Sequence, residues 1–188
     1  MIGVRKFGII LAATLVAATA ALAQVKQAEP VSALKGHNSN APVDVTADRI
    51  EVQDRSDRAI FAGNVHAVQA ELTLDTPRLT VAYSGGQGTA NKNVQIHRLD
   101  AAGGVVVKSP TETAKGDFGI YDLDRKLITL IGNVQLNREQ NQVNGSRLVI
   151  DLDSGRAVVD GGPPGVNQSG GRVAGHFTVP QRQQQKQK

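Results

Sequence analysis

The chain has 188 residues, enough for one domain with a hydrophobic core, and no cysteine, so its stability cannot depend on disulfides. The formal net charge of +4 overstates its basic character, because residues 24–180 hold 16 of the 21 basic residues against all 17 acidic ones. Without a basic excess to attract phosphates, and with only 3% aromatic residues to stack on bases, the composition excludes nucleic acid as a partner.

Residues 1–23 have the features of a secretory signal peptide. Arg5 and Lys6 precede an apolar run over residues 7–22, and Ala21-Leu22-Ala23 is a small-residue cleavage motif. An uncleaved membrane anchor is the alternative, but the run is short for a membrane span and rich in Ala and Thr. We therefore expect export of a soluble protein whose mature chain begins near Gln24.

The next residues, 24–42, are polar and contain Pro30, Gly36 and Pro42 without periodicity, which predicts a flexible leader. From Val43 the chain becomes a series of short extended runs separated by turn residues. No long stretch keeps helical periodicity with capping residues, so this pattern predicts an all-β domain over residues 43–160. Its first strands are expected at about 43–53 and 58–69, joined by an Asp/Ser-rich turn.

One block of this domain occurs twice. Residues 47–83 and 116–152 align without a gap at an offset of 69, and six of the 37 pairs are identical. Chance would give roughly two identities, so an internal repeat is the better interpretation. The shared residues include a Gly-Asn-Val sequence that begins at Gly63 and at Gly132. Because glycine within a strand marks a bend or a close approach of backbones, this sequence is expected to shape the sheet.

Both copies also change phase in their third strand. Leu72 and Leu74 occupy even positions, whereas Leu79 and Val81 occupy odd ones, and a strict two-residue period cannot keep both pairs on one face. A β-bulge near Thr76-Pro77 would return these side chains to the same side. The second copy predicts the same shift around Gly145-Ser146.

The remaining segments complete the domain. Between the copies, Gly103-Gly104 is expected to kink a strand that continues into Val105-Val106-Val107. A last strand is expected over about 156–160, after an Asp-Ser-Gly turn. Residues 161–188 are rich in Gly, Pro and Gln, which predicts a disordered tail, with residues 172–179 as a candidate edge strand.

No group of residues predicts catalysis, a metal site or a cofactor. The four histidines (His37, His66, His97 and His176) lie far apart, and no pair has the spacing of metal ligands. The paired carboxylates Asp122/Asp124 and Asp151/Asp153 lie where hairpin turns are expected, which explains them better than calcium binding or acid–base chemistry. No serine lies in a Gly-x-Ser-x-Gly motif. We therefore expect a protein that is not an enzyme.

Several segments resemble one known family. They are Val45-Thr46-Ala47-Asp48-Arg49, Phe61-Ala62-Gly63-Asn64-Val65, Ala114-Lys115-Gly116-Asp117 with Tyr121-Asp122, Leu130-Ile131-Gly132-Asn133-Val134, and Gly145 to Leu152. Over about residues 43–160 the chain is similar to the LptA/OstA-like family of periplasmic lipopolysaccharide-transport proteins. The resemblance implies an open, twisted β-jellyroll, a V-shaped sandwich of antiparallel strands, that binds lipid A acyl chains inside. It also implies molecules stacked end to end, between an inner-membrane export complex and an outer-membrane translocon.

The alternation of apolar residues predicts which side chains line the interior. The lining is aliphatic, with few aromatic residues to fill the middle, and this suits a long hydrocarbon chain. The candidate lipid-binding residues are Phe61, Val65, Leu72, Leu74, Leu79, Val81, Leu130, Val134, Leu136, Leu148 and Ile150. The alternative for each is that it fills a dry core.

The first strand (residues 43–53) and the last (156–160) are expected to be unpaired sheet edges. Edges recruit strands of other molecules, so we expect head-to-tail self-association through them. The alternative function is a structural or adhesive secreted β-sandwich without a ligand. A secreted carbohydrate-active enzyme is a third alternative. It would need carboxylates that converge in a groove, whereas the paired carboxylates here are expected in turns.

Overall fold

The computed structural model describes residue 34 and residues 37–85, 94–162 and 171–178. The signal peptide expected at 1–23, most of the leader and most of the tail lie outside these residues. Within the described part, no helix is long and apolar enough to cross a membrane. The elements are β1 (Asp44–Thr46), β2 (Arg49–Gln53), the 3-10 helix η1 (Asp54–Ser56), β3 (Arg58–Gln69), β4 (Leu72–Ser84), β5 (Gln95–Lys108), β6 (Glu112–Asp122), β7 (Leu127–Arg138), β8 (Asn141–Asp151), β9 (Arg156–Asp160) and β10 (Ala174–His176).

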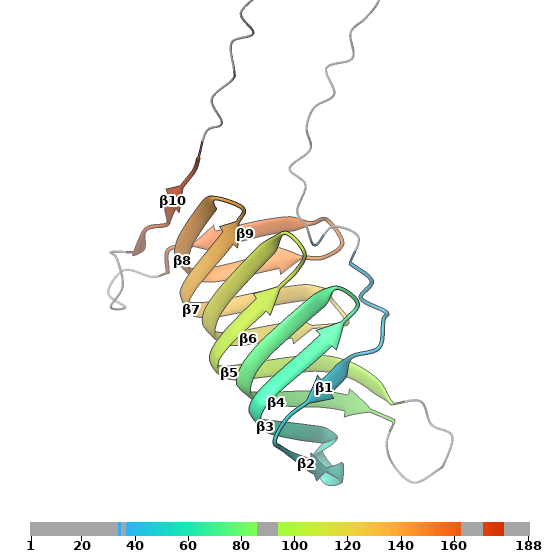
Figure 1. Ribbon diagram of the computed structural model, residues 1–188. Coiled ribbons are helices and arrows are strands. Elements are labelled where there is room, and N and C mark those ends of the chain that lie inside the picture. The colour runs from blue at the N-terminus through green and yellow to red at the C-terminus, as the bar shows by residue number, and fades with distance from the viewer. Residues whose placement is uncertain (1–33, 35–36, 86–93, 163–170, 179–188) are drawn as a thin grey trace, which may run out of the picture.

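The described strands form a single antiparallel sheet in which β3 to β8 follow one another in chain order. At one edge β1 and β2 both pair with β3, and at the other β9 and β10 both pair with β8. The two edges do not meet, so the sheet stays open. Figure 1 shows that the strands curve back, so that the sheet folds over onto itself. This confirms the predicted all-β, open jellyroll.

A line of register shifts crosses the sheet and bends it. The ladders shift between Ala62 and Val65 of β3, and at the matching positions of each following pair up to β7 and β8. Because bulges bend strands, each long strand contributes one segment to each of two layers. We call the layer that holds β2 and β9 layer A, and the layer that holds β1 and β10 layer B.

The repeated Gly-Asn-Val sequence lies on this bend line and has the same geometry twice. The φ angles are 78° at Gly63 and 45° at Asn64, and the second copy repeats them at 78° and 44°. Asn64 Nδ2 donates to Asp48 Oδ2 over 2.8 Å, and the equivalent donation, from Asn133 to Asp117, spans 2.7 Å. A Cβ at either glycine would overlap the aspartate carboxylate. The internal repeat therefore encodes the bend at β3 and at β7.

The bulge expected near Thr76-Pro77 requires a correction. The phase change of β4 does lie there, since Leu72 and Thr76 are buried before it and Leu79 after it. The extra residues, however, lie on the neighbouring strands, at Gly63-Asn64 of β3 and around Gly103-Gly104 of β5. Glycine can adopt the positive φ that a bulge of this kind uses, whereas the proline ring fixes φ near −65°.

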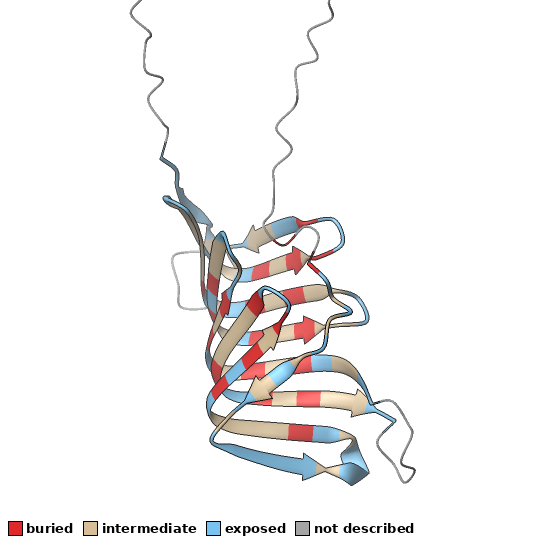
Figure 2. Cartoon of the chain, turned by 45° about the vertical axis from the view of Figure 1, so that its right-hand side comes forward, coloured by how far each residue is buried: buried red, intermediate tan, exposed pale blue. Residues whose placement is uncertain are grey.

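The hydrophobic core lies between the two layers. Burial alternates along the strands (Figure 2), and Leu79, Leu130 and Leu148 have no exposed surface. The leader contributes to this core as well, because Leu34 is 2% exposed and His37 is 8% exposed. At these positions the leader is therefore packed, rather than flexible as expected. The expected strand over 43–53 is interrupted at Ala47-Asp48, and the candidate edge strand within 172–179 is present as β10.

Candidate functional site

All eleven candidate lining residues face the space between the layers. Eight of them are buried, and Phe61, Leu74 and Leu136 are partly buried and pack against the same cluster. Cross-strand neighbours such as Phe61 with Leu79, and Leu130 with Leu148, place their side chains on one face of layer A. Two-residue alternation thus brings these residues together in one apolar interior.

The central strands contribute lining residues that the sequence analysis missed. Leu99, Ala101, Val105 and Val107 of β5 are buried, as are Ala114 and Tyr121 of β6. Their signal was present, because Leu99 with Ala101 and Val105 with Val107 each alternate by two, with the phase changing across Gly103-Gly104. The interior is therefore one continuous surface from β3 to β8.

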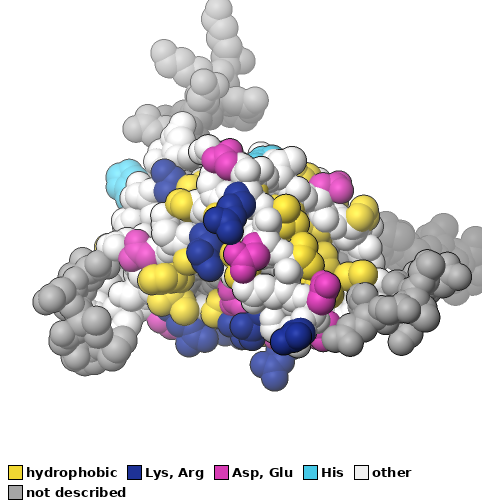
Figure 3. Space-filling view, turned by 90° about the horizontal axis from the view of Figure 1, so that it is seen from below, with side chains coloured by type: hydrophobic (Ala, Val, Ile, Leu, Met, Phe, Trp, Pro, Cys, Tyr) yellow, Lys and Arg dark blue, Asp and Glu magenta, His cyan; other side chains and the backbone are white. Residues whose placement is uncertain are grey.

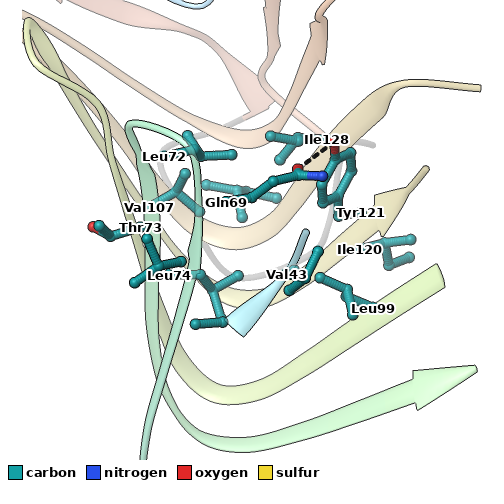
Figure 4. A pocket seen from close by; sticks show the side chains of 14 residues that line it. Val43, Gln69, Leu72, Thr73, Leu74, Leu99, Val107, Ile120, Tyr121 and Ile128 are labelled. Carbon is teal, nitrogen blue, oxygen red and sulfur yellow. Dashed lines mark hydrogen bonds between the residues drawn. The ribbon is translucent and has the colours of Figure 1, made fainter. Parts of the chain in front are cut away.

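The space between the layers is filled by the protein's own side chains. A cavity of about 30 Å³ remains, with Val43, Gln69 and Leu72 among its lining residues. Figure 4 shows these side chains around the cavity together with Leu74, Leu99 and Tyr121. This volume is about that of one water molecule and far below that of a fatty acyl chain. A hydrocarbon guest would have to displace side chains or separate the layers.

The apolar face continues to the β2 edge, where it is open. Ile50 and Val52 pair with Phe61 and Ala59 in the ladder and so lie on the same face, but they are 54% and 57% exposed. Figure 3 looks at the molecule from this end and shows hydrophobic side chains exposed among charged ones. The apolar inner face of the sheet is thus exposed to solvent at its N-terminal edge.

The buried polar side chain of Gln69 lies within the apolar lining. It is 4% exposed, and its amide makes four hydrogen bonds. Tyr121 OH donates to Gln69 Oε1 over 2.9 Å and so joins the layers (Figure 4). Burial raises the pKa of the Tyr121 hydroxyl.

A Ser-His-Asp arrangement lies outside the interior. Ser84 Oγ is 2.7 Å from Nε2 of His97, whose Nδ1 is 3.0 Å from Oδ2 of Asp124. Sequence reasoning missed it because the residues come from three different segments. The side chains of His97 and Asp124 are 35% and 55% exposed, whereas a catalytic triad needs a buried acid and a site that excludes water. We interpret it as a surface hydrogen-bond cluster that ties β4, β5 and the β6–β7 turn together.

Other charged groups form surface pairs. The hydrogen bonds from His66 and Lys108, at 2.6 and 2.9 Å, hold the pKa of Asp75 below its usual range. The hydrogen bond to Asp153 raises the pKa of Lys126, and hydrogen bonds from Ser154 lower the pKa of Asp151. Within the described segments, no group of three or more His, Asp or Glu side chains could hold a metal ion.

An open antiparallel sheet, bent along a line of bulges around a continuous apolar interior, defines an open β-jellyroll. The family model described as "LptA/(LptD N-terminal domain) LPS transport protein" matches residues 44–156. The chain therefore belongs to this family of lipopolysaccharide (LPS) transport proteins, as the sequence motifs had suggested.

Two further comparisons found a similar sequence and a similar fold. An uncharacterised protein of Rhizobium meliloti (strain 1021), R00383, is 34% identical over 152 residues, which cover 80% of each chain. The crystal structure of LptH from Pseudomonas aeruginosa, an LptA-homologous periplasmic component of the lipopolysaccharide transport device, matches with a TM-score of 0.64 at 16% identity. That match covers 76% of this chain and 99% of LptH, and it shows a shared fold.

Proposed function

We propose that this protein is a periplasmic lipopolysaccharide carrier that binds lipid A acyl chains between its two layers. In this role it receives lipopolysaccharide from an inner-membrane export complex and passes it to an outer-membrane translocon. Membership of the LPS transport family supports the role. The main support for this binding site is the apolar face that runs through the interior and is exposed to solvent at Ile50 and Val52.

Burial of hydrocarbon supplies the driving force for binding. Each buried methylene contributes about 0.8 kcal/mol, so a chain of a dozen carbons gains roughly 10 kcal/mol. Part of this gain must offset the opening of a filled interior. The bend line supports such opening, because the long strands β3 to β8 pass from one layer to the other there. Opposite the bend, side-chain contacts and the Gln69–Tyr121 hydrogen bond hold the layers together.

The sheet edges support self-association in the same scheme. Only one side of β2 is paired in the described chain, with β3, and only one side of β9, with β8. A β9 edge added to the β2 edge of a second copy would continue the sheet and its apolar face. The interior of one molecule would then join that of the next.

Photocrosslinking to lipid A tests the proposed site. A photoreactive phenylalanine analogue at Phe61 is expected to crosslink strongly, because this side chain faces the open end of the interior. The matched control is the same analogue at Phe118, which is 55% exposed on the outer face of layer A. Equal crosslinking from both positions would exclude the interior as the binding site.

A structural β-sandwich without a ligand is the second candidate, and the filled interior favours it. The crosslinking experiment separates the two functions. A carrier gives a Phe61 signal that saturates with lipid A and falls with unlabelled competitor. An inert sandwich gives only a weak signal that does not saturate at either position.

A further inference from the structure

Residues 37–43 form a segment that we call the strap. In Figure 1 the strap, in blue, runs along the open side of the bent sheet before it enters β1. It begins at His37, which is 8% exposed, and just before it Leu34 is 2% exposed. The strap has few hydrophobic residues, yet its first residue and the nearby Leu34 are buried in the core.

Gln69 fastens the strap. Its Nε2 donates to the backbone carbonyls of Ser39 and Ala41, both over 3.0 Å. Its Oε1 accepts from Tyr121 OH and faces Nε2 of His37 at 3.1 Å, a contact in which the ring nitrogen donates. Three of the four hydrogen bonds of this buried amide therefore lead to the strap. Because an unpaired buried amide costs free energy, Gln69 is suited to a state in which the strap is in place.

The strap and Leu34 also occupy apolar space. Leu34 lines a small cleft together with Leu72, Leu136 and Ile150, which are three of the candidate lipid-binding residues. At the other end of the strap, Val43 lines the cavity of about 30 Å³ with Leu72 and Leu74. The segment therefore covers the same aliphatic side chains that an acyl chain would contact.

We propose that the strap and Leu34 are an intramolecular plug that fills an acyl-chain subsite, and that an entering aliphatic chain displaces them. This inference rests on the proposed function. Both occupants use apolar contact with the same residues, so they compete for them. The apparent affinity for lipid is then the intrinsic affinity multiplied by the fraction of molecules in which the strap is released.

Variants of the strap itself test the competition. The double substitution Leu34→Ala with His37→Ala removes the buried leucine and one hydrogen bond to Gln69 without changing any strand. It is expected to lower the apparent Kd for purified lipid A by about tenfold or more. Asn40→Ala is the matched control, because Asn40 is an exposed strap residue, and this variant should bind like the wild type.

A reversible disulfide that holds the strap in place is expected to have the opposite effect on lipid A binding. The protein has no cysteine, so His37→Cys with Glu71→Cys introduces a unique cysteine pair. The two native side chains approach each other, with His37 Nδ1 3.7 Å from Glu71 Oε1. The oxidised protein, with its disulfide verified by thiol titration, is expected to lose lipid A binding, and reduction should restore it. A separate Leu34→Cys variant should react slowly with a polar maleimide and faster once lipid A is added.

The outcomes separate the plug from the proposed function. Equal lipid A binding by wild-type, oxidised and double-alanine proteins, with unchanged Leu34→Cys reactivity, would overturn the plug and leave the carrier function intact. If circular dichroism shows folded proteins and neither the wild type nor the double-alanine variant binds lipid A, the carrier function and the plug both fail. Binding that ends on oxidation and returns on reduction supports the plug.

Discussion

The aspartates Asp48 and Asp117 show how single residues set the shape of this sheet. Each accepts a hydrogen bond from the Asn of Gly-Asn-Val and lies so close to the glycine that no Cβ fits. The repeat alignment identified these residues as shared, and glycine chemistry predicted a bend. The contact itself could not be predicted, because the partners are 16 residues apart and meet only through strand register.

Replacing the glycine of the second copy tests this geometry. Gly132→Ala is expected to lower the free energy of unfolding by about 2–3 kcal/mol, because the new Cβ meets Asp117 and the φ of 78° strains any L-residue. The control is Gly104→Ala, whose φ is 97° but whose Cβ would meet nothing within 4 Å. This control should lose only about 1 kcal/mol in urea unfolding. Equal losses would show that backbone strain alone matters.

The Asp75 carboxylate predicts a small pH effect. The hydrogen bond from His66 is the largest cause of the lowered pKa of Asp75 in the folded protein, and the hydrogen bond from Lys108 is the next. The contribution of Asp75 to stability is therefore present above the unfolded-state pKa near 3.8. The contribution is lost as pH falls through the lower folded-state pKa. Because the side chain is 38% exposed, screening keeps the effect well under about 1 kcal/mol.

Urea unfolding of wild type and Asp75→Asn measures this contribution. The difference between the two is expected to be largest above about pH 4, to shrink below it, and to weaken with added salt. A difference that grows on acidification would contradict the assigned direction of the pKa shift.

Individual strands were predictable where strong turn signals bound them. The strands at 58–69 and 156–160 have the expected bounds, because Asp/Ser-rich or Gly-containing turns precede them. The break between β1 and β2 was not predictable, since it depends on Asp48 turning toward Gly63 and Asn64 of the neighbouring strand. The lining residues of β5 and β6 were missed because most of this stretch precedes the second copy of the repeat.

Self-association is predicted to depend on the edge strands of the sheet. Ile50→Lys with Val52→Lys places two charges at exposed positions on the inner face of β2, and natural edge strands use such inward-pointing charges to prevent pairing. By sedimentation velocity, this variant is expected to remain monomeric at concentrations at which the wild type associates. Ile131→Lys, an exposed position on the outer face of layer A, is the control and should still associate. A wild type that is monomeric at high concentration would contradict assembly through the edges.

At the scale of the molecule, strand alternation predicted the interior but not how full it is. Each candidate lining residue does face the space between the layers, because a two-residue period fixes the face of a strand. How the side chains of the two layers mesh depends on the bend angle, which follows from long-range contacts. The insertion of Leu34 and the hydrogen bonds of Gln69 to the strap also lay beyond sequence reasoning, since the leader is polar and has no periodicity.

The chain-order pairing of β3 to β8 has a consequence for growth of the fold. The repeat offset of 69 residues carries β3 onto β7, so one unit corresponds to two successive hairpins. Inserting one more unit would lengthen the molecule by four inter-strand spacings, about 19 Å, and leave its cross-section unchanged. The length of the molecule and its cross-section can therefore vary independently in this architecture. Duplication of a repeat unit would change the length, whereas the bends formed by Asp, Gly and Asn would keep the cross-section constant.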